Sequence, residues 1–219
     1  MSISKKWNWE ENKEDIWLKP SVESHYYGNI WQSKGFNNIL DLGCGMGRHA
    51  ILFAKMNFNV DAFDLSEYAI NYLKVWAQEE KVKVNTKIGD MLDLPYEDNR
   101  FDAIFSYHTI SHTNSTGIKQ IFTEIKRVLK SNGEIFLTLC SKDTWSFKEA
   151  GYPHHDPNTV IKTDDGPEKG VLHYYVNLED IEELFSEFEI ISIRHIDDIF
   201  YTDKINHSKH YFVHAKIIK

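Results

Sequence analysis

The sequence predicts an α/β protein built on a doubly wound, mostly parallel sheet in three layers. Between residues 37 and 140, short apolar runs typical of buried strands alternate with stretches of helical period. A glycine-rich segment follows the first apolar run, as expected where a strand passes into a helix. Two strand-like runs end the chain without a helix between them, which favours an antiparallel pair.

Length, charge and cysteine content narrow the class of protein. With 219 residues, the chain can form one domain with a sizeable core but not two of usual size. A formal net charge of -8 disfavours a nucleic-acid partner and favours a small-molecule substrate. Cys44 and Cys140 are the only cysteines, so we expect a reducing compartment and no disulfide framework. Because no apolar run has the length of a signal-peptide core or a membrane span, we expect a cytoplasmic protein without membrane attachment.

Residues 1–36 are rich in aromatic side chains but have no clean period, which indicates one or two short helices. Either the aromatic residues cover the edge of the sheet, since such side chains mainly supply burial, or they form a cap over the ligand site. They are Trp7, Trp9, Trp17, Tyr26, Tyr27 and Trp31.

The strongest local signal lies in residues 38–50, where an apolar run breaks into glycines at positions 43, 45 and 47 before a helical pattern begins. Glycines permit positive φ angles and a close approach of ligand to backbone, and the helix start presents unpaired N–H groups. This combination predicts a nucleotide-like ligand. Asp41 precedes the glycines, and its carboxylate would repel a pyrophosphate but can accept hydrogen bonds from an ammonium group or from the loop backbone.

The next two strands end in further acidic residues. Residues 59–63 form a short strand that ends at Asp64, at the edge where open α/β sheets bind ligands, so this carboxylate is suited to ribose hydroxyls. Ser66 can cap the following helix. Residues 82–88 form the third strand, and Asp90 after it can accept a hydrogen bond from an exocyclic amine.

The fourth strand, residues 101–107, leads to His108 and His112 at the same edge. The two histidines would share a face if this piece is helical. Either could act as a general base, both could bind one metal ion, or they could simply pack on the ligand or meet solvent. Together with His173, they are the candidate catalytic residues.

The second half of the chain is less regular. A helical pattern over residues 118–129 precedes a buried-type strand at 135–139, but the pattern then lapses over residues 141–176, and we expect a substrate lid there. This lid contains His154, His155 and Asp156, whose spacing is not that of a metal site, so no metal is predicted. Asn177 can cap a last helix before the antiparallel pair at residues 189–196 and 210–217.

Over roughly residues 37–140, the chain resembles the class I S-adenosylmethionine-dependent methyltransferases. The resemblance rests on the ordered motifs Asp41-Leu42-Gly43-Cys44-Gly45-Met46-Gly47, Asp64, Gly89-Asp90 and Asn99-Arg100-Phe101-Asp102. It implies a seven-stranded sheet with a reversed last strand, S-adenosylmethionine as the cofactor and S-adenosylhomocysteine as the product. We expect a single domain in four parts: a helical cap (1–36), a cofactor-binding core (37–140), the lid (141–176), and a last helix with a strand pair (177–219).

By this resemblance, the glycines would lie against the methionine and ribose parts of the cofactor, Asp64 would hold the ribose, and Asp90 with Met91 would meet the adenine. The implied cofactor-binding residues are Asp41, Gly43, Cys44, Gly45, Gly47, Asp64, Leu65, Asp90, Met91 and Ser106.

Three functional hypotheses follow from these observations. The first is methyl transfer to a small-molecule acceptor, whose nucleophilic atom stays open. The second is a non-catalytic regulatory or partner protein that binds the same cofactor. The third is a nicotinamide-dependent oxidoreductase, because Gly45, Gly47 and Ala50 also fit the G-x-G-x-x-A fingerprint with Asp64 about 20 residues further on. Asp41 and the reversed last strand speak against the third hypothesis.

Overall fold

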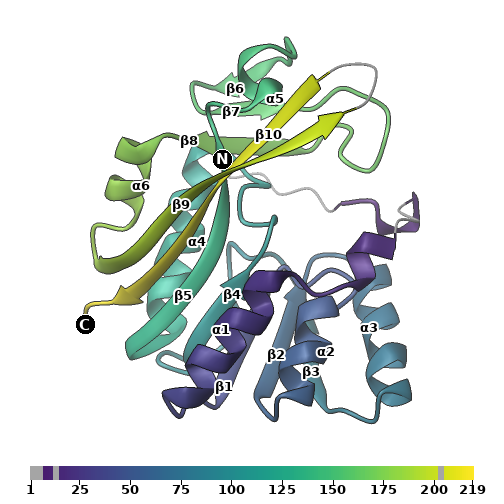
Figure 1. The fold of residues 1–219 in the computed structure, drawn as a ribbon, viewed down its shortest axis with the longest axis vertical. Coiled ribbons are helices and arrows are strands. Elements are labelled where there is room, and N and C mark those ends of the chain that lie inside the picture. The colour runs from purple at the N-terminus through teal and green to yellow at the C-terminus, as the bar shows by residue number, and fades with distance from the viewer. Residues whose placement is uncertain (1–6, 12–14, 202–204) are drawn as a thin grey trace.

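The computed structural model describes residues 7–11, 15–201 and 205–219, and a twisted sheet runs through its centre (Figure 1). The first half of the sheet is parallel in the order β3-β2-β1-β4-β5. These strands span Asn38–Leu42 (β1), Asn59–Asp64 (β2), Val84–Ile88 (β3), Phe101–Ser106 (β4) and Leu129–Ser141 (β5). Since β1 lies between β2 and β4, the strand order reverses direction at β1, and the loop after it lies where such sheets bind ligands.

The two strands at the end of the chain complete the sheet as predicted. β10 (Ile205–Ile217) pairs antiparallel with β5, and β9 (Phe188–Tyr201) pairs antiparallel with β10. The predicted reversed last strand is therefore confirmed. Both strands are longer than predicted: β10 pairs with β5 only from His210 onward, so its first residues continue with β9 as a hairpin beyond the sheet (Figure 1).

Helices cover both faces of the sheet (Figure 1). Apolar residues of α1 (Val22–Ser33), α2 (Arg48–Lys55) and α3 (Glu67–Glu79) pack on one face. Those of α4 (Ser115–Val128) and α6 (Leu178–Leu184) pack on the other. The doubly wound three-layer class is thus confirmed. Two predicted caps are also present: the side chains of Ser66 and Asn177 accept the backbone N–H groups of Ala69 and Asp180.

The segment expected to be irregular, residues 141–176, contains secondary structure of its own. It forms α5 (Trp145–Lys148) and the strands β6 (His154–Asp156), β7 (Thr159–Ile161) and β8 (Leu172–Val176). β8 joins this small antiparallel group to the end of β5. Strands of three to five residues are too short for an alternating pattern to be evident, and β8 is buried along its whole length.

The first described residues form two 3-10 turns, η1 (Trp9–Glu11) and η2 (Asp15–Leu18), before α1. Among the residues with described structure, no helix is both long enough and apolar enough to cross a bilayer.

Candidate active site

One cavity of about 970 Å³ opens at the carboxyl edge of the parallel strands. The loops after β1, β2 and β3 line one part, which we call the cofactor end; it includes Gly43, Gly45, Asp64, Asp90 and Met91. The segment after β4, the lid and the β9–β10 hairpin line the other part, which we call the histidine end. It includes His108, His112, Lys162, Glu168, His173 and His210.

The glycine loop has the backbone shape that its sequence predicts. Gly43, Gly45 and Gly47 have φ angles of 73°, 53° and 96°. The N–H of Gly43 donates to the carbonyl oxygen of Phe63 at 2.8 Å, which attaches the loop to β2. A Cβ at Gly45 would lie 2.4 Å from the ring of Trp9, so only glycine fits there without displacing the chain that covers it.

Asp64 braces this loop and also faces the cavity. Its Oδ2 accepts the N–H of Gly45 and its Oδ1 accepts the N–H of Ser66, each at 2.8 Å. Burial raises the pKa of Asp64 despite these hydrogen bonds. Nearby, Asp90 Oδ1 accepts the N–H of Leu92 at 3.0 Å. Asp90 lines the cavity, as do the implied cofactor-binding residues Cys44, Leu65 and Met91.

Three of the implied cofactor-binding residues lie behind the cavity wall. Asp41 is 1% exposed and accepts a hydrogen bond from the backbone of Ala50 in α2. Gly47 caps α2, and a Cβ there would lie 2.2 Å from Leu73. Ser106 is buried and donates its hydroxyl to the Leu42 carbonyl oxygen at 2.8 Å. We therefore expect these three residues to shape the site from behind.

The N-terminal aromatic residues divide between the two roles that the sequence allowed. The rings of Trp7, Trp9 and Trp17 contact one another at centroid distances of 4.5–5.9 Å and line the cavity above the glycine loop. Arg48, which sequence reasoning missed, lies against the ring of Trp17 and donates to the carbonyl oxygen of Ile16 at 2.8 Å. In contrast, Tyr27 and Trp31 are buried against the sheet.

The histidines after β4 do not lie on a helix, because residues 107–113 form turns and bends. His108 therefore does not share a helix face with His112, although both line the cavity. His108 has a φ angle of 54°, unusual for a side chain with a Cβ, and its N–H donates to Thr138 Oγ1 at 2.7 Å. The His112 ring lies 4.7 Å from that of His173, between centroids. Burial lowers the pKa of all three histidines, so each imidazole is neutral at pH 7.

Sequence reasoning missed Lys162, Glu168 and His210 at the histidine end, because they come from loops and a hairpin without a motif. The lid triplet that drew attention in the sequence has another role. Asp156 accepts both the N–H and the hydroxyl of Ser115, at 3.1 and 2.7 Å, and so attaches the lid to the start of α4.

Several proteins of similar sequence are methyltransferases. Residues 39–133 match the family model described as a methyltransferase domain. The sterol 24-C-methyltransferase ERG6B of Gibberella zeae is 30% identical over 112 residues, 50% of this chain and 29% of that protein. Phosphoethanolamine N-methyltransferase 3 of Arabidopsis thaliana is 34% identical over 128 residues, 54% of this chain and 26% of that protein. The chain thus spans less than a third of the length of either relative.

Solved structures share the fold. A S-adenosylmethionine-dependent methyltransferase from Methanosarcina mazei has a TM-score of 0.73 at 20% identity, covering 91% of this chain and 99% of that one. The 1,6-didemethyltoxoflavin-N1-methyltransferase of Burkholderia thailandensis, solved with S-adenosylhomocysteine, has a TM-score of 0.66 at 16% identity, covering 94% and 82%. Residues 39–133 therefore match a methyltransferase domain, and the chain shares the fold of S-adenosylmethionine-dependent methyltransferases, which points to S-adenosylmethionine as the cofactor.

The cofactor end fits this cofactor. Glycines with positive φ at positions 43 and 45 let a ligand approach the backbone closely, and Asp64 and Asp90 present carboxylates from two adjacent strand ends. The Oδ2 atom of Asp41 is buried behind the loop and has no hydrogen-bond partner among the residues that the structure describes.

Proposed function

We propose that the chain transfers a methyl group from S-adenosylmethionine to a small polar acceptor bound at the histidine end of the cavity. The observation that carries this proposal is the continuity of one cavity from the glycine loop to the histidines and Glu168. Bound at the cofactor end, S-adenosylmethionine would supply an electrophilic methyl group on its sulfonium sulfur. The charged lining from Lys162 and Glu168 favours a polar acceptor, whereas the relatives named above differ in acceptor, a sterol in one and phosphoethanolamine in the other.

The residues would divide the work by position. Gly43 and Gly45 would hold the cofactor through the backbone, Asp64 would accept the ribose hydroxyls, and Asp90 with Met91 would contact the base. Positioning an acceptor in line can contribute about 7–11 kcal/mol to catalysis. If the acceptor is a hydroxyl or a protonated amine, the neutral imidazole of His108 is the first candidate to accept its proton, ahead of His112 and His173.

Calorimetric titration tests the cofactor part of the proposal. The wild-type protein should bind S-adenosylmethionine and S-adenosylhomocysteine but not NAD(H). The Asp64→Asn variant should bind both roughly 10-fold or more weakly, because it loses charge-assisted hydrogen bonds. The matched control is Asp93→Asn, an exposed residue that should leave the affinity unchanged.

The same titration separates the alternatives. Binding of NAD(H) alone would favour the oxidoreductase hypothesis and overturn the proposal. Once an acceptor is identified, the His108→Asn variant should lower kcat by about 10²-fold or more while the cofactor affinity stays unchanged. Cofactor binding without transfer to any acceptor would support the hypothesis of a non-catalytic partner protein.

A further inference from the structure

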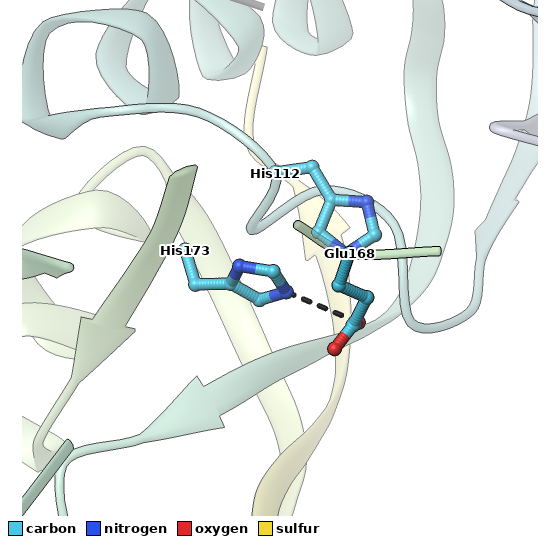
Figure 2. Close-up of side chains that lie close together, drawn as sticks. All are labelled: His112, Glu168 and His173. Atoms are coloured by element: carbon cyan, nitrogen blue, oxygen red, sulfur yellow. Dashed lines mark hydrogen bonds and ion pairs between the residues drawn. The ribbon is translucent and has the colours of Figure 1, made fainter. Parts of the chain in front are cut away.

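Three side chains from separate parts of the chain converge at the histidine end (Figure 2). His112 comes from the turn after β4, Glu168 from the lid loop and His173 from β8. One ligand atom of each lies within 4.8 Å of those of the other two. In Figure 2, the His112 ring and the Glu168 carboxylate lie on the same side of His173, and a dashed line joins Glu168 to His173. Such a cluster of two imidazoles and a carboxylate is a common ligand set for transition metals.

The contacts of His173 suit a bound cation. Nδ1 lies 3.2 Å from the carbonyl oxygen of Val171, and Nε2 lies 3.2 Å from Oε1 of Glu168. Both neighbours are acceptors, but a neutral imidazole carries only one N–H. His173 is 2% exposed. In a neutral ring, one of the two contacts therefore places a nitrogen lone pair against an oxygen, which is costly in a buried site.

A metal ion between Nε2 and Oε1 resolves this conflict. The proton then stays on Nδ1 and is donated to the Val171 carbonyl oxygen, the outer-shell contact that fixes the tautomer of most metal-binding histidines. Two ligands of one tetrahedral ion at about 2.0–2.1 Å lie roughly 3.3 Å apart, close to the separation of 3.2 Å seen here. Lys162 holds the other oxygen, Oε2, so the ion would bind on the Oε1 side of the carboxylate.

We propose that His112, Glu168 and His173 bind one divalent transition-metal ion of the Zn²⁺ type, with an open coordination position that faces the cavity. Three protein ligands and one open position are the arrangement of catalytic rather than structural zinc sites. The Nδ1 atom of His210, which lines the same cavity, is buried and has no partner among the described residues. A hydroxyl or thiol acceptor bound at the open position would lose its proton more readily.

The test is titration of the chelator-treated, dialysed protein with Zn²⁺ in competition with a chromophoric chelator, without cofactor or acceptor. Wild type should bind one ion per chain, and Co²⁺ should give visible absorption bands at the same stoichiometry. The Glu168→Gln and His173→Ala variants should each bind Zn²⁺ roughly 100-fold more weakly or worse, since even outer-shell losses cost 10–100-fold. The matched control is His154→Ala, an exposed lid histidine, which should bind like wild type.

Three outcomes would overturn the proposal: no stoichiometric Zn²⁺ binding by wild type, unchanged affinity in Glu168→Gln, or an equal loss in His154→Ala. Circular dichroism and the affinity for S-adenosylhomocysteine verify that each variant is folded. If one variant does not fold, the His112→Asn variant is tested for loss of Zn²⁺ binding in its place. The assay does not involve methyl transfer, so failure of the proposed function would leave its result intact.

Discussion

At the level of single residues, burial controls the protonation of the Asp41 carboxyl group. Desolvation raises the pKa of its carboxyl group to about 7, and the hydrogen bond from Ala50 and the charge of Arg48 offset only part of that rise. In the unfolded chain the same group titrates near 3.8. Between these two values, the folded protein holds a proton that the unfolded chain has released.

This difference predicts a pH dependence of stability. Where the folded state binds more protons than the unfolded state, the free energy of unfolding falls as the pH rises. The burial of Asp41 should therefore lower the free energy of unfolding increasingly between about pH 4 and about pH 7. The Asp41→Asn variant is neutral throughout, so its stability relative to wild type should increase over that range. Urea denaturation at several pH values measures the effect, with Asp93→Asn as the exposed control. Parallel pH profiles for Asp41→Asn and wild type would contradict the assignment.

At the scale of the element, one carboxylate connects α1, β5 and β10. Glu134 in β5 is 4% exposed and accepts hydrogen bonds from Trp31 Nε1 at 3.0 Å and from His214 Nε2 at 2.9 Å. The ammonium group of Lys34 binds its other oxygen. Burial alone would raise the pKa of Glu134, but the hydrogen bonds from His214 and Lys34 outweigh it and hold the pKa at about 2.

Removing this charge should loosen the packing of α1 and β10 on β5. We expect Glu134→Gln to lower the free energy of unfolding by about 2–3 kcal/mol at pH 7, because buried donors lose a charged acceptor. The contribution is fully present above pH 4.5 and is lost as the pH falls towards 2, so the two proteins should converge in acid. Glu187→Gln removes an exposed ion pair with Lys126 and should cost at most about 1 kcal/mol. Equal losses in both variants would contradict a special role for Glu134.

At the scale of the whole molecule, ligand binding should stabilise the fold, because the cavity draws on nearly every part of the chain. The N-terminal turns, the glycine loop, the strand ends, the lid and the terminal hairpin all contribute to its wall. A ligand that fills the cofactor end contacts several of these segments at once. It does not bind the unfolded chain, in which these segments are apart.

S-adenosylhomocysteine at 100 times its Kd should therefore raise the free energy of unfolding by about 2.7 kcal/mol. For a chain of 219 residues, this corresponds to a rise in Tm of roughly 5–10 °C, measurable by differential scanning fluorimetry. Asp64→Asn at the same ligand concentration should show a smaller rise, and NAD should have no effect on either protein. A rise with NAD equal to that with S-adenosylhomocysteine would be inconsistent with the assigned cofactor.

From the sequence alone come the alternation of strands and helices over residues 37–140, the reversed last strand and the position of the glycine loop. Its signals there are local: glycines at 43 and 45 set the loop shape within a few residues, and Asp64 ends the strand next to that loop, so spacing along the chain fixes position in space. Only the tertiary structure brought His112, Glu168 and His173 together, and only it placed Trp9 over the loop but Trp31 in the core. Those contacts join residues far apart in the chain through turns and very short strands, where no periodic pattern records which residues will meet.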